Sequence, residues 1–305
     1  MQNALTIDVE DYFHVEAFSA VIDRQDWPHY PSRVEKNTQL ILDLLGTKNV
    51  KATFFVLGWV AKRFPALVKN IAQQGHEVAS HGLSHKLVYA QTPQEFRSET
   101  RESKEILEDL AQQPVIGYRA ATYSITKSSL WALDILAEEG FRYDSSIFPV
   151  RHDKYGIPHA KTTPHTLKTV DGNSLIEYPL SVLPLGGFNV PVAGGGYFRF
   201  FPYRFTKWAL ARLNRGGDPF VFYLHPWELD PDQPRIRNAT ALSRFRHYLN
   251  LDRCFSRLVK LIDDFPFAPM CEILNQGDVL GTSKESMPLA SLAPKDDLHR
   301  LHQDR

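Results

Sequence analysis

Three carboxylates crowd the end of an apolar segment near the start of the chain. Asp8, Glu10 and Asp11 close the sequence ALTIDVED, whose apolar part is Ala4–Val9. Carboxylates held close together share a proton or bind a cation, because their charges repel. These residues therefore predict a metal site, although a solvated loop start or a helix cap would give the same pattern.

A pair of histidines follows a second apolar segment. His81 and His85 stand four residues apart in HGLSH, a spacing that places both imidazoles on one side of a helical turn. Imidazole and carboxylate form a common ligand set for divalent transition metals. With one acid the pair makes a three-ligand site, which leaves positions open for water and substrate as a catalytic metal requires. Taken alone, such a pair is more often a feature of a surface helix.

Two more segments end in a residue that carries chemistry. Arg119 follows a short apolar segment, and His225 follows the apolar stretch Pro219–Leu224. In parallel α/β proteins the loops after the carboxyl ends of the strands converge. We therefore expect Asp8, His81, Arg119 and His225 to meet in one site. Each has an ordinary structural explanation when taken singly, Arg119 as a surface salt bridge for instance, and their joint order favours function.

The elements that must position these residues alternate in type. Apolar segments alternate with amphipathic ones, which predicts an α/β domain built on a parallel sheet or barrel. Gly46 and Gly75 are expected at helix ends. Strands are predicted at Ala4–Val9, Ala52–Leu57, His76–Ala79, Pro219–Leu224 and Met270–Leu274, and helices around residues 40–45, over 60–71, Pro93–Leu110, Thr126–Glu139 and Ala241–Asp264.

The amino-acid composition changes along the chain and divides it into parts. We expect a catalytic domain over residues 1–235, in which Pro, Gly, His and Tyr over residues 145–196 predict a loop-rich insertion. A C-terminal helical extension over residues 236–275 would pack on this domain. The Ser-, Lys- and Asp-rich residues 276–305 predict a disordered tail.

Composition excludes several classes of protein. The formal net charge of the 305 residues is zero, which disfavours nucleic acid as a partner. No apolar run approaches the roughly 20 residues of a membrane span, and the first strand begins too early for a signal peptide, so we expect a cytoplasmic protein, associated with a membrane at most through a biosynthetic complex. Cys254 and Cys271 are expected to be free thiols. The oligomeric state is not predicted.

With these motifs in this order, the chain resembles carbohydrate esterase family 4, the polysaccharide deacetylases of chitin, peptidoglycan and nodulation factors. The resemblance covers roughly residues 4–230. The segments DVEDYFHV, RHDKYGIP, GGGYFRFFPY and HPWE are similar to the branch found beside exopolysaccharide and exosortase loci, which carries its own C-terminal extension. The resemblance implies a distorted (β/α) barrel of about seven parallel strands.

The resemblance also implies roles for the residues of the first motifs. Asp8 is expected to be the general base, and Arg119 of GYRAATYS to pair with it and keep it ionised. Where the family commonly has two adjacent aspartates, Val9 stands second here, so the metal-binding acid is Glu10 or Asp11. Strand alternation favours Glu10, and a local bulge would present Asp11 instead. His81 and His85 complete the implied metal site.

The later motifs imply the acid and the substrate contacts. His225 of FYLHP is expected to be the general acid, with Asp144 of YDSS as its partner. A backbone N–H near Tyr123 is expected to stabilise the oxyanion. Leu224 and Trp227 are candidates for an apolar acetyl pocket and a sugar-stacking face, with a core position as the other interpretation of Trp227.

Two features keep two interpretations, and a third is a glycine-rich turn. Glu228 is expected either to tune His225 or to pair with an arginine. His152 would contact substrate or lie on the surface. Gly194–Gly196 lacks the lysine of a phosphate loop and is expected to form a tight turn near the cleft.

The implied enzyme removes N-acetyl groups from N-acetylhexosamine units of a polysaccharide or oligosaccharide, an exopolysaccharide or its precursor. Its implied cofactor is a divalent metal ion, zinc before cobalt or nickel. A related amidohydrolase on a small cyclic amide, or an O-acetyl esterase, would use the same residues. A non-catalytic glycan-binding module is the alternative from another class, and acetate release separates it from an enzyme.

Overall fold

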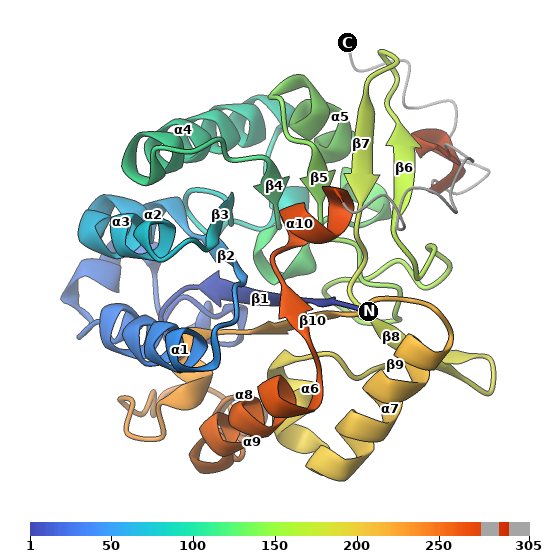
Figure 1. Cartoon of the computed structure of the whole chain (residues 1–305). Helices are drawn as coiled ribbons and strands as arrows, with labels where there is room; N and C mark the ends of the chain where they lie inside the picture. Colours follow the sequence, from blue (N-terminus) through green and yellow to red (C-terminus); the bar gives the residue numbers. More distant parts are fainter. Residues whose placement is uncertain (276–286, 293–305) are drawn as a thin grey trace.

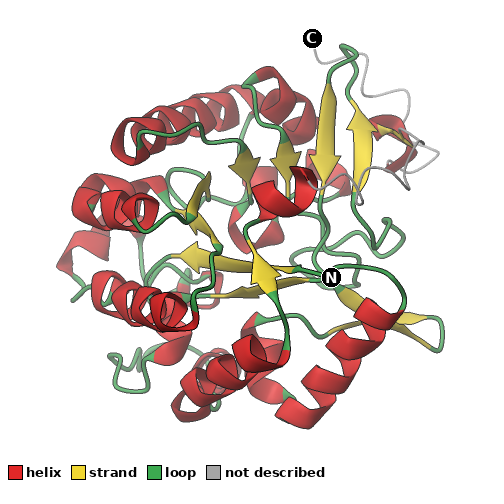
Figure 2. Cartoon of the chain, viewed as in Figure 1, coloured by secondary structure: helices red, strands yellow, loops and turns green. Residues whose placement is uncertain are grey.

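A mostly parallel β-sheet forms the centre of the computed structural model, which describes residues 1–275 and 287–292. Helices surround the strands (Figures 1 and 2). Seven strands are parallel neighbours, in agreement with the barrel that the family resemblance implied: β10 (Val221–Leu224), β1 (Asn3–Val9), β2 (Thr53–Val56), β3 (Glu77–Ser80), β4 (Gly117–Tyr118), β5 (Tyr143–Asp144) and β7 (Ser174–Glu177), in this order.

The remaining strands extend the sheet beyond β7, pair with the start of β1 or form a separate hairpin. β6 (His165–Lys168) pairs antiparallel with β7, β12 (Met287–Pro288) pairs parallel with β6, and β11 (Phe267–Ala268) pairs with β1. β8 (Val182–Leu185) and β9 (Phe188–Pro191) form a separate hairpin. With β7, the strands β6, β8 and β9 lie in residues 145–196, where a loop-rich insertion was expected.

The barrel closes irregularly between β7 and β10. The backbone N–H of Val221 donates to the Ser181 hydroxyl at 2.8 Å, and that of Tyr223 donates to the Ala193 carbonyl at 3.0 Å. Gly194 has a φ of +136°, and a Cβ there would lie 2.0 Å from the Tyr223 carbonyl oxygen. Only glycine fits so close an approach of two backbones. The tight turn expected at Gly194–Gly196 is not formed, because a helix begins at Gly195, but Gly195 and Gly196 do border the cavity.

Ten α-helices are described. The helix expected at Pro93–Leu110 is present and begins with a capping box of Thr92 and Glu95. Their bounds are α1 Val34–Lys48, α2 Gly58–Arg63, α3 Pro65–Gln73, α4 Pro93–Ala111, α5 Trp131–Glu138, α6 Gly195–Phe200, α7 Tyr203–Arg215, α8 Ala241–Tyr248, α9 Leu251–Asp264 and α10 Met270–Asn275. Short 3₁₀ helices are η1 Glu16–Phe18, η2 Arg24–His29, η3 Val88–Ala90, η4 Ala121–Tyr123, η5 Lys127–Ser129, η6 Pro226–Leu229 and η7 Leu289–Leu292.

Several predicted boundaries were wrong. The helix expected over Ala241–Asp264 is broken between α8 and α9, where Asn250 adopts a left-handed φ of +51°. Met270–Leu274 is helical, and the short strand precedes it as β11. The first helix continues through Gly46 and ends at Asn49, which has a φ of +50°. Asparagine tolerates this conformation and therefore ends helices as glycine does.

Strand β1 shows how the fold orients the site. All seven residues are buried, as expected for a parallel strand covered on both faces. Leu5, Ile7 and Val9 join the main apolar core. Thr6 and Asp8 alternate with them and therefore face the opposite side of the sheet. The strand thus carries a polar pair into the barrel while its apolar residues hold it in place.

Other expectations concern the chain as a whole. The tail predicted over residues 276–305 lies outside the described residues except for 287–292, where β12 and η7 form. Cys254 and Cys271 are both free, as predicted. No helix in the described part of the chain is both long and apolar enough to span a membrane.

Candidate active site and metal centre

Asp8 and Arg119 form a buried ion pair at the ends of β1 and β4. Arg119 Nη1 donates to Asp8 Oδ1 at 2.7 Å and to Thr6 Oγ1 at 2.7 Å. The guanidinium is fully buried, and its other nitrogens are held by the carbonyl and hydroxyl oxygens of Ser145. Burial alone would lower the pKa of Arg119, but the charge of Asp8 outweighs this and raises it. The predicted pairing of the two residues is therefore observed, and Arg119 is no surface arginine.

Glu10, His81 and His85 meet at the end of β1 and β3. Each offers one ligand atom, and these atoms lie within 4.8 Å of one another. Glu10 Oε2 is 2.6 Å from His85 Nε2. Although burial opposes it, the two nearby imidazoles of His85 and His225 hold the pKa of Glu10 well below its usual value. The acid is thus an anion facing two imidazoles.

The residues of this cluster fit a divalent cation. All three are buried, and Glu10 Oε2 has no hydrogen bond of regular geometry among the described residues. His81 Nδ1 lies 2.8 Å from the Arg119 carbonyl, so it carries the proton and leaves Nε2 as the ligand atom. Burial lowers the pKa of His81 to about 4, which keeps the imidazole neutral. Two imidazole nitrogens and a carboxylate suit zinc, cobalt or nickel.

The loop that carries the two histidines is not the helical turn expected from their spacing. Gly82 and His85 have positive φ values, +74° and +55°, which an α-helix does not allow. The loop is instead fixed by the start of α2, where the N–H of Gly58 donates to the Gly82 carbonyl at 2.8 Å. Arg24 holds the other end through the His85 carbonyl at 3.0 Å.

Asp11 points away from this cluster. Its carboxylate accepts hydrogen bonds from the Ser32 hydroxyl at 2.6 Å and from the N–H groups of Arg33 and Val34 at 2.8 and 3.1 Å. Of the two acids considered for the metal, only Glu10 lies with the histidines. Asp11 fixes the start of α1 instead.

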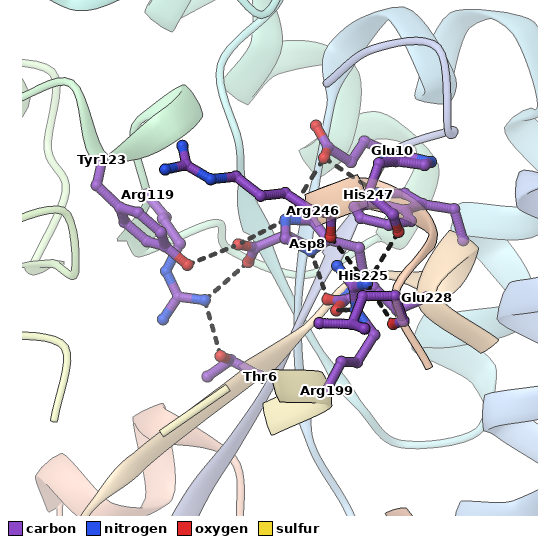
Figure 3. A network of polar contacts seen from close by, with 12 residues as sticks. Thr6, Asp8, Glu10, Arg119, Tyr123, Arg199, His225, Glu228, Arg246 and His247 are labelled. Carbon is purple, nitrogen blue, oxygen red and sulfur yellow. Dashed lines mark hydrogen bonds and ion pairs between the residues drawn. The ribbon is translucent and has the colours of Figure 1, made fainter. Parts of the chain in front are cut away.

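His225, at the end of β10, lies opposite Asp8 and is held by Glu228. Its Nε2 is 3.9 Å from Asp8 Oδ2 and 3.4 Å from Glu10 Oε1, and its Nδ1 is 2.8 Å from Glu228 Oε1 (Figure 3). Burial opposes protonation of His225, but Glu10, Glu228 and Asp8 together raise its pKa to about 9. The imidazole is therefore protonated at neutral pH.

Glu228 makes both contacts that the sequence left open. While Oε1 faces His225, Oε2 accepts a hydrogen bond from Arg199 Nε at 2.6 Å. Against the effect of burial, Arg199 and His225 lower the pKa of Glu228 to about 2. Arg199 Nη1 also donates to the carbonyls of His247 and Leu249 at 2.8 and 2.9 Å. The acid is thus supported by a chain of charges that reaches the end of α8.

The expected pairing of Asp144 with His225 was wrong. Asp144 accepts hydrogen bonds from the N–H and hydroxyl of Ser146 at 3.0 and 2.6 Å and lies beside Glu177. Burial raises the pKa of Asp144, and burial and the Asp144 charge raise that of Glu177 well above its usual value. Because Ser146 accepts the N–H of Ala120, Asp144 supports the loop that carries Arg119.

Three expected substrate contacts also differ. Leu224 is fully buried in the main core and does not line the cavity, so it forms no acetyl pocket. Trp227 borders the cavity but is 5% exposed and stacks on His247 and His225, with ring centroids 4.2 and 5.3 Å away, so it is packed into the cavity wall and is not an exposed sugar-stacking face. The N–H of Tyr123 donates to the Ala120 carbonyl and is not available to an oxyanion.

Asp8, Glu10, His85 and His225 border one cavity of about 240 Å³. Tyr123 borders it and directs its hydroxyl to Asp8 Oδ2 at 3.4 Å. Sequence reasoning missed Arg199, which lies in a glycine- and aromatic-rich segment without periodicity, and His247, which lies beyond the last motif. The short spacing of Glu228 from His225 was the one signal for the carboxylate that orients the acid.

Two segments of the chain match known protein families. Residues 25–143 match the family described as polysaccharide deacetylase, and residues 145–275 match a domain of unknown function, DUF3473. The chain is 45% identical over 74 residues to a peptidoglycan-N-acetylglucosamine deacetylase of Bacillus cereus, covering 24% of this chain and 27% of the relative. It is 34% identical over 100 residues to a chitooligosaccharide deacetylase of Rhizobium leguminosarum, covering 33% and 44%.

Solved structures share the fold. A protein of Mycobacterium smegmatis assigned to the polysaccharide deacetylases has a TM-score of 0.60 at 20% identity, over 94% of this chain and 93% of that one. PuuE allantoinase has a TM-score of 0.58 at 14% identity, over 90% and 89%. The matches to the two named relatives span less than half of each relative's length.

Proposed function

The chain carries a polysaccharide deacetylase domain of carbohydrate esterase family 4, and from this premise we propose that it is a metal-dependent de-N-acetylase of N-acetylhexosamine units in a glycan. The observation that carries the proposal is the convergence of a buried Glu-His-His cluster, the Asp8–Arg119 pair and His225. Each part alone has a structural explanation, but their meeting at the mouth of one cavity supports hydrolysis.

Glu10, His81 and His85 would hold the cation. When bound, a divalent cation supplies a Lewis acid for the acetyl carbonyl and lowers the pKa of water. Zinc is our first choice because its sites commonly combine histidine with one carboxylate. The identity of the metal is part of the proposal.

The chain supplies a base and an acid on opposite sides of a narrow space. Asp8, oriented by Arg119 and the Tyr123 hydroxyl, accepts a proton from the attacking water. His225, protonated and oriented by Glu228, donates a proton from Nε2 to the departing amine nitrogen. The C–N bond breaks, the water oxygen stays with the acetyl carbon, and acetate and a free amino sugar result.

The natural glycan and the place of action belong to the proposal as well. We propose an exopolysaccharide or its precursor, on the resemblance of the motifs to that branch of the family. Action in the cytoplasm, at a biosynthetic complex on the membrane, is the corresponding expectation. Cell fractionation with an activity assay tests it, and activity outside the cytoplasm contradicts it.

The test of the reaction is acetate release from N-acetylglucosamine oligomers by protein that is stripped of metal and reloaded with zinc, cobalt or nickel. We expect release only after reloading, and none from Asp8→Asn. O-acetylated oligosaccharide and allantoin are included as substrates. Release from one of these alone would replace the proposed amide substrate, and glycan binding without any release would indicate a binding module.

A further inference from the structure

One arginine of the cavity has no part in the proposed reaction. Arg246, in α8, lines the same cavity as Asp8 and His225, and its side chain is exposed. In Figure 3 it extends across the view toward Tyr123, with no contact drawn from its guanidinium. Within residues 1–275 and 287–292 this guanidinium has no hydrogen-bond or ion-pair partner.

The other arginine of the cavity wall differs in this respect. Arg199 is 2% exposed, and its charge is neutralised by Glu228. At the rim, Lys154 is likewise paired with Glu16 at 2.8 Å. Arg246 is thus an unpaired guanidinium beside cations that are paired. Because arginine presents a rigid fork of N–H donors that matches carboxylate and phosphate groups, it is suited to bind an anionic group of a ligand.

The backbone of Arg246 is fixed to the acid side of the site. Its carbonyl accepts a hydrogen bond from Arg199 Nη1 at 3.2 Å, and the next residue, His247, stacks on Trp227. His247 Nε2 is further held by Gln233 Oε1 at 2.7 Å. The side chain therefore starts from a defined position relative to His225.

The charge of Arg246 also affects His152, which stacks on a residue of the cavity wall. Burial lowers the pKa of His152, and the Arg246 charge adds to this effect. His152 stacks on Tyr155 at 3.8 Å between ring centroids, and Tyr155 lines the cavity. Asp153, which is exposed, pairs with His152 and not with Arg246. Tyr155 and Tyr123, toward which the Arg246 side chain extends in Figure 3, give the same cavity an aromatic wall of the kind that a sugar ring packs against.

We propose that Arg246 binds an anionic group, a carboxylate or a phosphate, that is attached to the reacting N-acetylhexosamine directly or through the next sugar unit. Both groups match the guanidinium fork, and both would be bound in the same way. The inference rests on the proposed function and narrows its substrate to an acidic glycan or a phosphate-bearing precursor. Arg246 is then the residue that selects charged over neutral chains.

The test compares kcat/KM on three substrates: neutral N-acetylglucosamine oligomers, an oligosaccharide alternating N-acetylglucosamine with glucuronic acid, and N-acetylglucosamine 1-phosphate. We expect the wild-type protein to prefer an anionic substrate by roughly tenfold, the size of one charge-assisted pair at a partly exposed site. Arg246→Gln should bring this ratio near one, mainly through KM, and Arg246→Lys should restore part of it. Preference for the glucuronic acid oligosaccharide would identify an acidic glycan as the substrate, and preference for N-acetylglucosamine 1-phosphate would identify a phosphate-bearing precursor.

Arg244→Gln is the matched control. Arg244 is exposed on the same helix but lines a different hollow, so its loss should leave the ratio unchanged. Equal kcat/KM on neutral and anionic substrates, or an unchanged ratio in Arg246→Gln, overturns the inference and leaves the proposed reaction standing.

Absence of turnover on every substrate contradicts the proposed function instead. In that case calorimetric binding of the uronate oligosaccharide and of N-acetylglucosamine 1-phosphate decides the inference. Arg246→Gln should then bind the favoured anion roughly tenfold more weakly than wild type and Arg244→Gln, and equal binding by all three overturns it.

Discussion

The two sides of the cavity are built in different ways. The base and metal side comes from the ends of β1, β3 and β4, where each polar residue has a short contact to the next and Arg119 joins the two parts through Asp8 and His81. The acid side comes from β10 and a chain of charges through Glu228 and Arg199.

The two sides of the cavity also come from different parts of the sequence, and the acid side lies in the second half of the chain. The acid, its carboxylate and its arginine all lie within residues 145–275, the part matched by a domain of unknown function. This segment therefore contributes to the site itself and is not an appendage to it. Variants that separate the two sides test this comparison.

Glu10→Gln should abolish cation binding and acetate release, because it removes the only acid that lies with the two described histidines. Asp11→Asn, one residue away, should retain the cation and lower the free energy of unfolding by about 1–3 kcal/mol through its hydrogen bonds near Ser32. Metal analysis after dialysis and urea unfolding measure the two effects. Loss of the cation in Asp11→Asn alone would reverse the assignment.

Asp8→Asn should lower kcat by roughly 10²–10⁴-fold, the contribution of a positioned general base, while cation content stays unchanged. Thr6→Val is the control on the same face of β1, since it removes the second acceptor of Arg119 Nη1 and the hydrogen bond to the Phe222 carbonyl but leaves Asp8 in place. Its kcat should fall by less than tenfold. Similar losses in both variants would make Asp8 a structural partner of Arg119.

Glu228→Gln should reduce kcat at neutral pH by roughly tenfold, about the contribution of one charge-assisted hydrogen bond. The carboxylate helps to raise the pKa of His225 to about 9, so its removal lowers that pKa. His225 then loses its proton at a lower pH, so the alkaline limb of the plot of kcat against pH moves to lower pH.

Asp144→Asn gives the contrast to this shift. Its carboxylate contacts Ser146, not His225, so the alkaline limb should stay in place. A shift in Asp144→Asn without one in Glu228→Gln would restore the pairing implied by the sequence motifs.

Trp227→Phe should cost only a few-fold in kcat, or about 1 kcal/mol. It removes the indole N–H that lies 3.4 Å from Glu10 Oε1 and shrinks the ring between the two sides, while the Glu10 and histidine ligands remain. Steady-state kinetics with metal analysis measure this. Complete inactivation, with the fold intact by circular dichroism, would contradict this prediction and show that the two sides of the cavity depend on each other.

The base side was predictable because its residues end strands. Apolar segments identified β1 and β3, and alternation along β1 selected Glu10 over Asp11 on the correct face. The spacing of His81 and His85 indicated a shared ligand site but the wrong backbone, since helical spacing says nothing of the positive φ that His85 adopts.

The acid side was not predictable to the same extent. Arg199 reaches Glu228 across 29 residues of sequence, and no periodicity marks that contact. Asp144 was assigned by motif order, whereas its environment depends on Glu177, a residue in the loop-rich segment. Likewise, the break at Asn250 that sets α8 beside the cavity interrupts an apolar pattern that reads as one helix.

The most direct test of the account is a titration of metal-free protein with Zn²⁺, with bound zinc and acetate release measured in the same samples. The account predicts that both rise together and saturate at one cation per chain in wild type, and that Asp8→Asn binds the same cation without release. Release from the metal-free protein, or full release by Glu10→Gln, would contradict it.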